Sequence, residues 1–103
     1  MVKVIIWTQT AQRVFDGIIE YLLTHADSSE PAKTFFLEVY NQIDKISNHP
    51  TRGRRVKGTK SMRFLNFKKH YEIHYRMSGN TLFISNFFDT RQHPDKRPYS
   101  GNT

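Results

Sequence analysis

The stretch of sequence that decides the fold runs from Arg63 to Pro94 and reads RFLNFKKHYEIHYRMSGNTLFISNFFDTRQHP. Residues 71–77 at its centre alternate apolar and polar side chains, a period of two that is typical of a strand with one buried face. Gly79-Asn80 suits a tight hairpin turn, and Lys68-Lys69-His70 makes a polar break before the central run. The stretch therefore predicts three antiparallel strands, and we expect functional residues at the sheet end, in 89–94.

Two apolar stripes at helical spacing precede this stretch and predict two amphipathic helices. The first stripe consists of Ala11, Val14, Phe15, Ile18, Ile19, Leu22 and Leu23, and the second of Ala32, Phe35, Phe36, Val39, Ile43 and Ile46. We expect Thr8 to cap the first helix, Ser28 or Ser29 to cap the second, and Pro50 to end it. The β-branched run Val2–Trp7 predicts a strand before the helices.

These elements predict an α+β fold in the order β-α-α-β-β-β. The first strand has to pair with the later meander, so one small, mostly antiparallel sheet is expected, with a helical hairpin packed on one face. The opposite face is then free to be open and basic. We assign residues 1–94 to a single domain and residues 95–103, which are polar, to a C-terminal tail.

Positive charge is concentrated in the second half of the chain. The formal net charge is +7, yet residues 1–50 carry four Lys and Arg against six Asp and Glu, whereas residues 51–103 carry twelve against three. Such an asymmetric distribution favours an anionic partner, either nucleic acid or an acidic protein. A solvated basic face without a partner is the alternative interpretation.

Several classes of function have no support in the sequence. The chain has no cysteine, which fits a cytoplasmic protein, and no apolar run approaches the roughly 20 residues of a membrane span. No HExxH, CxxC, Walker or GxGxxG motif is present, so we expect neither a metal nor a cofactor. His70 and His74 would lie about 13 Å apart on a strand, too far to share a metal ion. We expect His74 to be a solvated strand residue.

The basic residues of the second half are the candidates for binding a target or nucleic acid. This set consists of Arg52, Arg54, Arg55, Lys57, Arg63, Arg76 and Arg91. Several of them fall in Thr51–Ser61, which is longer than the usual connection of about four to six residues. Long basic loops often carry function, although mobility alone explains such a loop equally well.

A metal-free cleavage of RNA is one chemistry that these residues could support. It needs a base for the 2′-hydroxyl, an acid for the leaving oxygen and cations for the charge on phosphorus. His93 titrates in the right range to be base or acid, and Arg63 and Arg91 could hold the phosphate. The same residues would serve equally well as plain phosphate contacts or as a surface for an acidic protein.

From about Val4 to Pro94 the sequence resembles the RelE/ParE superfamily of bacterial toxins. The resemblance is carried by Ile6–Ala11, Asn48–Arg54, Arg63–Leu65, Tyr71–Tyr75 and Asp89–Pro94, in this order and spacing. It implies the toxin of a type II toxin–antitoxin pair, of the kind associated with plasmid stabilization. The implied partner is a cognate antitoxin that wraps the toxin in a hetero-oligomer, with no cofactor and no membrane involved.

Two activities occur in this superfamily. RelE-like members are mRNA interferases that cleave mRNA in the ribosomal A site, whereas ParE-like members inhibit growth by poisoning DNA gyrase and are not nucleases. Glu72 stands where a RelE-like arginine would be expected, and Leu65 stands where a lysine would help. The incomplete set favours a ParE-like toxin. The alternatives are a RelE-like ribosome-dependent endonuclease that uses Arg63, Arg91 and His93, and an inactive or RNA-binding member.

Overall fold

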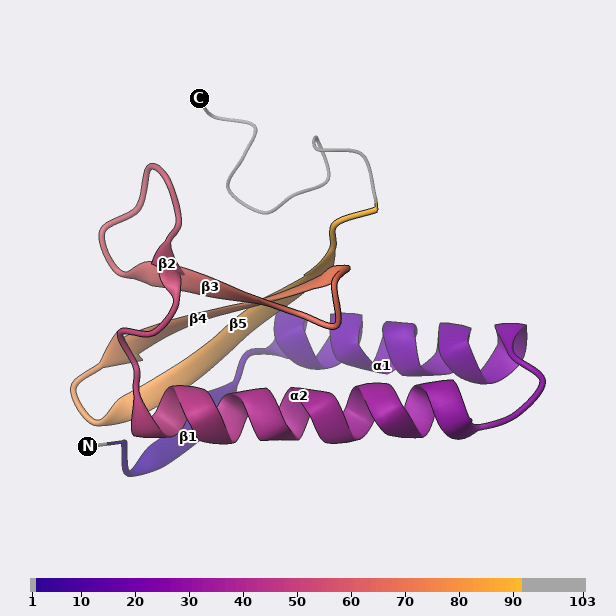
Figure 1. Cartoon of the computed structure of the whole chain (residues 1–103). Coiled ribbons are helices and arrows are strands. Elements are labelled where there is room, and N and C mark those ends of the chain that lie inside the picture. Colours follow the sequence, from indigo (N-terminus) through magenta and orange to yellow (C-terminus); the bar gives the residue numbers. More distant parts are fainter. Residues whose placement is uncertain (1, 92–103) are drawn as a thin grey trace.

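Two antiparallel helices lie across one face of a five-stranded sheet in the computed structural model, which describes residues 2–91 (Figure 1). The elements in chain order are β1 (Val4–Trp7), α1 (Gln9–His25), α2 (Glu30–Asn48), β2 (Arg54–Arg55), β3 (Met62–Phe67), β4 (Tyr71–Ser78) and β5 (Thr81–Asp89). The strand order is β1-β5-β4-β3-β2, with β1 parallel to β5 and the other pairs antiparallel. The predicted α+β architecture is confirmed.

The first strand joins the sheet beside the last one, as its need for a partner predicted. Val4 pairs with Thr81 and Trp7 with Ile84, so β1 forms one edge of the sheet. The chain then leaves through α1 and α2 and returns at the other edge as β2. This route leaves β4 at the centre of the sheet, between β3 and β5.

The three-strand meander is also confirmed. Ser78 pairs with Thr81 across the turn between β4 and β5, and Gly79 there has a φ of 58°. That conformation is easy for glycine and strained for most other residues, which explains glycine in the first turn position. Lys68 and Lys69, at the turn between β3 and β4, also have positive φ angles, 47° and 68°.

A β-bulge in β5 changes which of its residues face the helices. The partners of positions 74 and 75 on β4 are Asn86 and Ile84, so Ser85 is the extra residue of the bulge. Before the bulge the even-numbered residues of β5 face the helices, and after it the odd-numbered ones do. Phe87 is thereby turned into the core and Asp89 toward the helical side of the sheet.

The core lies between the two helical stripes and the alternating face of the sheet, as expected, although Leu23 and Phe36 of the predicted stripes are exposed. It consists of Ala11, Phe15, Phe35, Val39, Ile43 and Ile46 from the helices and of Phe67, Tyr71, Ile73, Tyr75, Leu82, Ile84 and Phe87 from the sheet. Each helix stripe needs an apolar surface to cover, and the sheet supplies it. In the part of the chain that the structure describes, neither helix is long and apolar enough to span a bilayer.

Two local features differ from the sequence prediction. The segment Thr51–Ser61 is not a plain loop, because Arg54 and Arg55 form the short strand β2, which pairs with Phe64 and Arg63 of β3. The N-cap of α2 is Ser29, as expected, although its side chain makes no capping hydrogen bond.

The face of the sheet opposite the helices is not the open, basic surface that was expected. Glu72 and His74 are 2% and 1% exposed, and the expectation that His74 is solvated is wrong. Both residues lie on the central strand, with Phe88 and Phe64 as their neighbours on β5 and β3. The ring of Phe64 stacks on His74 at 5.8 Å between ring centroids, and His74 Nε2 lies 3.0 Å from Glu72 Oε1.

Thr8 joins three elements and offers a test of this arrangement. Its hydroxyl accepts a hydrogen bond from the Ala11 N–H (3.1 Å) and donates one to the Ser85 carbonyl (3.0 Å). We expect Thr8→Ala to lower the free energy of unfolding by about 1–2 kcal/mol, because a helix cap and a contact between helix and sheet are lost together. Thr10→Ala, at an exposed position on the first turn of α1, is the matched control. Equal stability of the two variants in urea denaturation would contradict the role given to Thr8.

Candidate functional site

Hydrogen bonds fix the base of the basic segment that follows α2, and we call this set of bonds the loop anchor. It is formed by the side chains of Tyr75 and Arg63 and by the backbone of Pro50, Thr51 and Gly53. The Tyr75 hydroxyl donates to the Pro50 carbonyl (2.8 Å) and accepts from the Gly53 N–H (2.9 Å). Arg63 Nη1 donates to the carbonyls of Gly53 (2.6 Å) and Thr51 (3.2 Å). The anchor ties the end of α2 to the two strands β3 and β4.

The loop anchor is buried and closely packed, which restricts the residues that can form it. The Tyr75 side chain is 0% exposed, and this burial raises the pKa of its hydroxyl, so the group is protonated and able to donate. A Cβ atom at Gly53 would lie 2.6 Å from the Tyr75 hydroxyl and 2.8 Å from the Phe64 carbonyl oxygen. Only glycine fits there, which explains a glycine among arginines.

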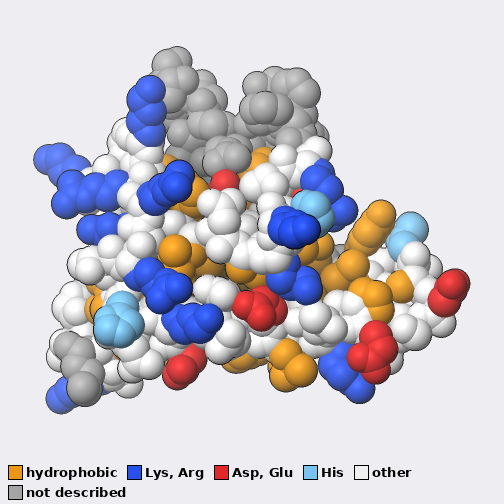
Figure 2. Space-filling model, viewed as in Figure 1, with side chains coloured by type: hydrophobic (Ala, Val, Ile, Leu, Met, Phe, Trp, Pro, Cys, Tyr) orange, Lys and Arg blue, Asp and Glu red, His pale blue; other side chains and the backbone are white. Residues whose placement is uncertain are grey.

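The anchor presents a segment that we call the basic loop, residues 52–60. Its five cations, all exposed, are Arg52, Arg54, Arg55, Lys57 and Lys60. Among residues 2–91, none of the five has an ion-pair partner. Figure 2 shows Lys and Arg side chains gathered at the end of the molecule where β2 and its loop lie. Uncompensated charge at this density is suited to an anionic partner.

Arg76 has a different environment from the basic loop. It lies on β4 between Met62 and Phe83, on the face of the sheet opposite the helices. Its guanidinium carbon is 4.2 Å from the centroid of the Phe83 ring, a cation–π contact. The side chain is half-buried, so part of its charge remains accessible.

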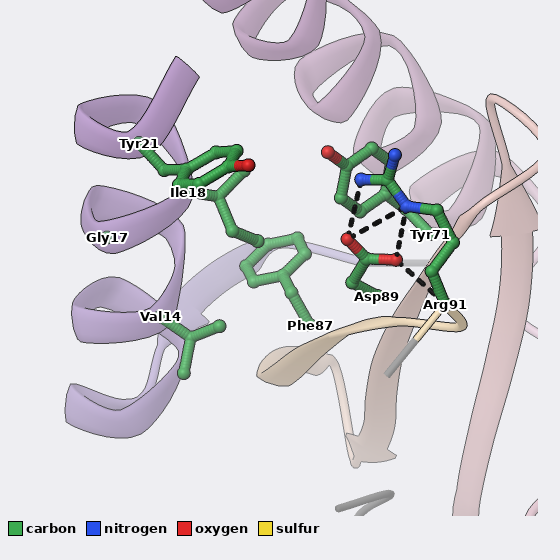
Figure 3. A pocket seen from close by; sticks show the side chains of 8 residues that line it. All are labelled: Val14, Gly17, Ile18, Tyr21, Tyr71, Phe87, Asp89 and Arg91. Atoms are coloured by element: carbon green, nitrogen blue, oxygen red, sulfur yellow. Dashed lines mark hydrogen bonds and ion pairs between the residues drawn. The ribbon is translucent and has the colours of Figure 1, made fainter. Parts of the chain in front are cut away.

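Arg91 lies at the far end of the sheet, where it forms an ion pair with Asp89 (Figure 3). Arg91 Nη2 is 2.7 Å from Asp89 Oδ2, and Arg91 Nε is 3.0 Å from Asp89 Oδ1. The hydrogen bond from Arg91 holds the pKa of the Asp89 carboxyl below its usual range. The pKa of Arg91 is raised by the same bond, so the pair is ionised at neutral pH.

A cavity of about 570 Å³ opens between α1 and this ion pair. Figure 3 shows side chains of α1 on one side of it and Phe87, Tyr71, Asp89 and Arg91 on the other. The lining residues are Val14, Gly17, Ile18, Tyr21, Tyr71, Phe87, Asp89 and Arg91. The cavity therefore offers a ligand both apolar and polar surface, and the charge of Arg91 there is already neutralised by Asp89.

The structure does not bring the predicted catalytic arginines together. Arg63 lies beside Tyr75 and Asp89 lies beside Tyr71, on opposite sides of β4. Four residues along that strand span about 13 Å, and Arg91 is bound to Asp89 at the Tyr71 end of this span. His93, the third predicted member of this set, lies outside the described residues, as do Pro94 and the tail 95–103.

The structure adds two features that the sequence did not reveal. The loop anchor joins residues that are distant in sequence, and only the isolated Gly53 hinted at a close approach. The Glu72–His74 pair was hidden because alternation alone does not show what covers a strand. Among residues 2–91, no three His, Asp or Glu side chains lie close enough to hold a metal ion.

Apolar side chains are exposed along β1 and on α2, and we call this surface the apolar edge. It consists of Val4, Ile5, Ile6, Phe36, Leu37 and Tyr40. The rings of Trp7 and Tyr40 lie 5.8 Å apart and join its two parts, while β1 forms an edge of the sheet. Exposed apolar residues on a free strand edge commonly mark a site of protein association.

Comparison with known proteins places this geometry in a family. A model of the family "ParE toxin of type II toxin-antitoxin system, parDE" matches residues 5–94. A solved structure of the chromosomal ParDE system from P. aeruginosa is similar, with a TM-score of 0.70 and 17% identity, over 85% of this chain and 96% of that one. A conserved hypothetical protein from Helicobacter pylori has a TM-score of 0.52 and 19% identity, over 89% and 98%. No curated protein sequence matches significantly.

The loop anchor can be tested by removing one atom. We expect Tyr75→Phe to lower the free energy of unfolding by about 1–3 kcal/mol, because the Gly53 N–H and the Pro50 carbonyl lose their buried partner. Tyr40→Phe, on the exposed surface of α2, is the matched control and should change stability by less than about 0.5 kcal/mol. Chemical denaturation measures both, and a neutral Tyr75→Phe would show that these bonds are dispensable.

Proposed function

We propose that this chain, which belongs to the ParE toxin family of type II toxin–antitoxin systems, inhibits growth by binding and poisoning DNA gyrase. In this proposal the toxin is not a nuclease, and its cognate antitoxin neutralises it. The observation that carries the proposal is that Arg63 and Arg91 are far apart and that each is already engaged within the chain.

Cleavage of RNA needs cations that converge on one phosphate. They have to lie within hydrogen-bonding distance of the oxygens on which charge develops, and a base and an acid have to flank them. Arg63 instead holds two backbone carbonyls, and Arg91 holds Asp89. Use of Arg63 in catalysis would break its partly buried hydrogen bond to the Gly53 carbonyl, and use of Arg91 would break its ion pair with Asp89. Both existing contacts argue against a catalytic role.

A protein target agrees better with the accessible features of the molecule. The exposed groups are a set of uncompensated cations on the basic loop and the apolar edge. Surfaces of this kind bind partners by charge complementarity and by burial of apolar area, without any chemical step. ParE-like members of the superfamily poison DNA gyrase, and we extend that target to this chain.

The apolar edge is the surface that we assign to the antitoxin. Antitoxins of such pairs wrap the toxin with a segment that becomes ordered on binding, and a free strand edge can accept such a segment as an added strand. Ile5 is 43% exposed on β1, and Leu37 is 60% exposed on α2. Covering these side chains would supply the apolar burial that offsets the ordering of the antitoxin.

Two assays on the same preparation test the mode of action. With DNA gyrase and supercoiled DNA, we expect the toxin to accumulate cleaved DNA, because a poison traps the enzyme with its DNA broken. In a translating ribosome extract, we expect mRNA to remain intact, as mapped by primer extension. Toxin mixed beforehand with its antitoxin is the control for both assays, and it should be inactive.

The opposite pair of results would identify a RelE-like nuclease. New mRNA 5′ ends at A-site codons, lost in Arg91→Ala while antitoxin binding is retained, would overturn the proposal. Soluble, folded protein without effect on gyrase, mRNA or growth would indicate an inactive member of the family.

A charge placed on the apolar edge tests the antitoxin surface. We expect Ile5→Asp to weaken antitoxin binding at least tenfold, equivalent to about 1.4 kcal/mol, because a carboxylate would have to be desolvated in the interface. Leu23→Asp is the matched control, since Leu23 is 50% exposed on α1 and lies outside the apolar edge. Calorimetric titration measures both. Equal affinities, with folding verified by circular dichroism, would place the antitoxin elsewhere.

A further inference from the structure

We propose that the basic loop is a binding site for the phosphate backbone of duplex DNA. The site consists of Arg52, Arg54, Arg55, Lys57 and Lys60, held by the loop anchor at one end of the sheet. The inference extends the proposed function: the toxin contacts the DNA on which gyrase acts as well as the enzyme. Because the loop belongs to the toxin, its binding to DNA can be measured in the absence of gyrase.

The first support is electrostatic. Between Asp44 and Glu72 the chain contains no acidic residue, and the five cations of the loop fall within this interval. All five are exposed, and none has an ion-pair partner among the described residues. Binding to phosphates therefore breaks no existing ion pair, and release of the counterions condensed on DNA would drive the association.

The second support is the fixed conformation of the loop. Val56 is 7% exposed, and its N–H donates to the Met62 carbonyl at 2.8 Å. The N–H and the hydroxyl of Thr59 both donate to the Val56 carbonyl, at 3.1 and 2.8 Å. Together with the loop anchor, these bonds hold the backbone between the cations in place. A preorganised set of charges loses less conformational entropy on binding than a mobile one.

The chemistry of the loop favours a duplex over a single strand. Proteins that hold single-stranded nucleic acid combine cations with aromatic side chains on which bases stack. Residues 51–61 contain no aromatic residue. The nearby Phe64 and Phe83 are engaged with His74 and Arg76. The loop is thus suited to contacts with backbone phosphates, which both strands of a duplex supply.

Charge density distinguishes DNA from an acidic protein. Duplex DNA carries one negative charge per about 1.7 Å of its axis, denser than an extended acidic peptide, in which residues are about 3.3 Å apart. The five cations of the loop are attracted more strongly to the polyanion with the higher charge density. We therefore expect the loop to bind a duplex more tightly than polyglutamate.

The test compares two variants with the same change in net charge. The site variant carries Arg54→Gln, Arg55→Gln and Lys57→Gln, and the control variant carries Lys3→Gln, Arg13→Gln and Lys33→Gln, all at exposed positions. Fluorescence anisotropy with a duplex of about 20 base pairs, at several salt concentrations, gives the Kd and its salt dependence. Single-stranded RNA of the same sequence and polyglutamate are the other probes.

We expect a loss of affinity for the duplex in the site variant and not in the control variant. The Kd of the site variant for the duplex should rise at least tenfold at low salt. A plot of the logarithm of the association constant against log salt should become less steep by about 2.7, or 0.9 for each lost phosphate contact. The control variant should stay within about twofold of the wild type, because its charges lie away from the site.

Three results would overturn the proposal. Equal losses in both variants would show that net charge, and no particular site, drives binding. Tighter binding of RNA or of polyglutamate than of the duplex would identify a different partner for the loop. Absence of duplex binding by the folded wild type at low salt would exclude the site altogether. Since the assay contains no gyrase, a negative result here is distinct from failure of the gyrase proposal.

Discussion

The hydroxyl of Tyr75 joins the central strand of the sheet to the segment that follows α2. It lies at the inner end of a fully buried ring on the central strand, and it bonds the backbone at Pro50 and Gly53 just after α2. Arg63 completes the same junction from β3. One buried side chain therefore fixes where the helical hairpin ends and where the basic loop begins. The carbonyls of Thr51 and Gly53 in this junction bind Arg63, which would otherwise be available to a phosphate.

A second constraint acts at the opposite end of the sheet. The bulge at Ser85 turns Asp89 toward the helical side, and Asp89 there neutralises Arg91 beside the cavity under α1. Arg63 and Arg91 are thus separated along β4, and each is bound to a different partner within the chain. The accessible charge that remains is on the basic loop, and the accessible apolar surface is on β1 and α2. A molecule arranged in this way is suited to binding macromolecules.

Much of the fold could be predicted because it depends on local periodicity. The alternation in residues 71–77, the two helical stripes and the Gly79 turn each specify an element, and one apolar face specifies how they pack. The site could not be predicted in the same way. The bulge, the Tyr75 bonds and the burial of His74 depend on partners in other strands or in the segment after α2, which no local pattern encodes. Arg63 was correctly placed on a strand, yet its chemical role depended on the carbonyls of Gly53 and Thr51.

In the native protein the loop anchor is closed, so that Arg63 is structural and the basic loop is held in place. Hydrogen exchange measured by NMR tests this closure by comparing two glycine amides of the same segment. Gly53 donates to the Tyr75 hydroxyl, whereas Gly58 is exposed at the tip of the loop. We predict that the Gly53 amide exchanges as slowly as the amides of β4 and that Gly58 exchanges rapidly. Equally rapid exchange at both glycines would show that the loop anchor is open, and Arg63 would then be free to act on a phosphate.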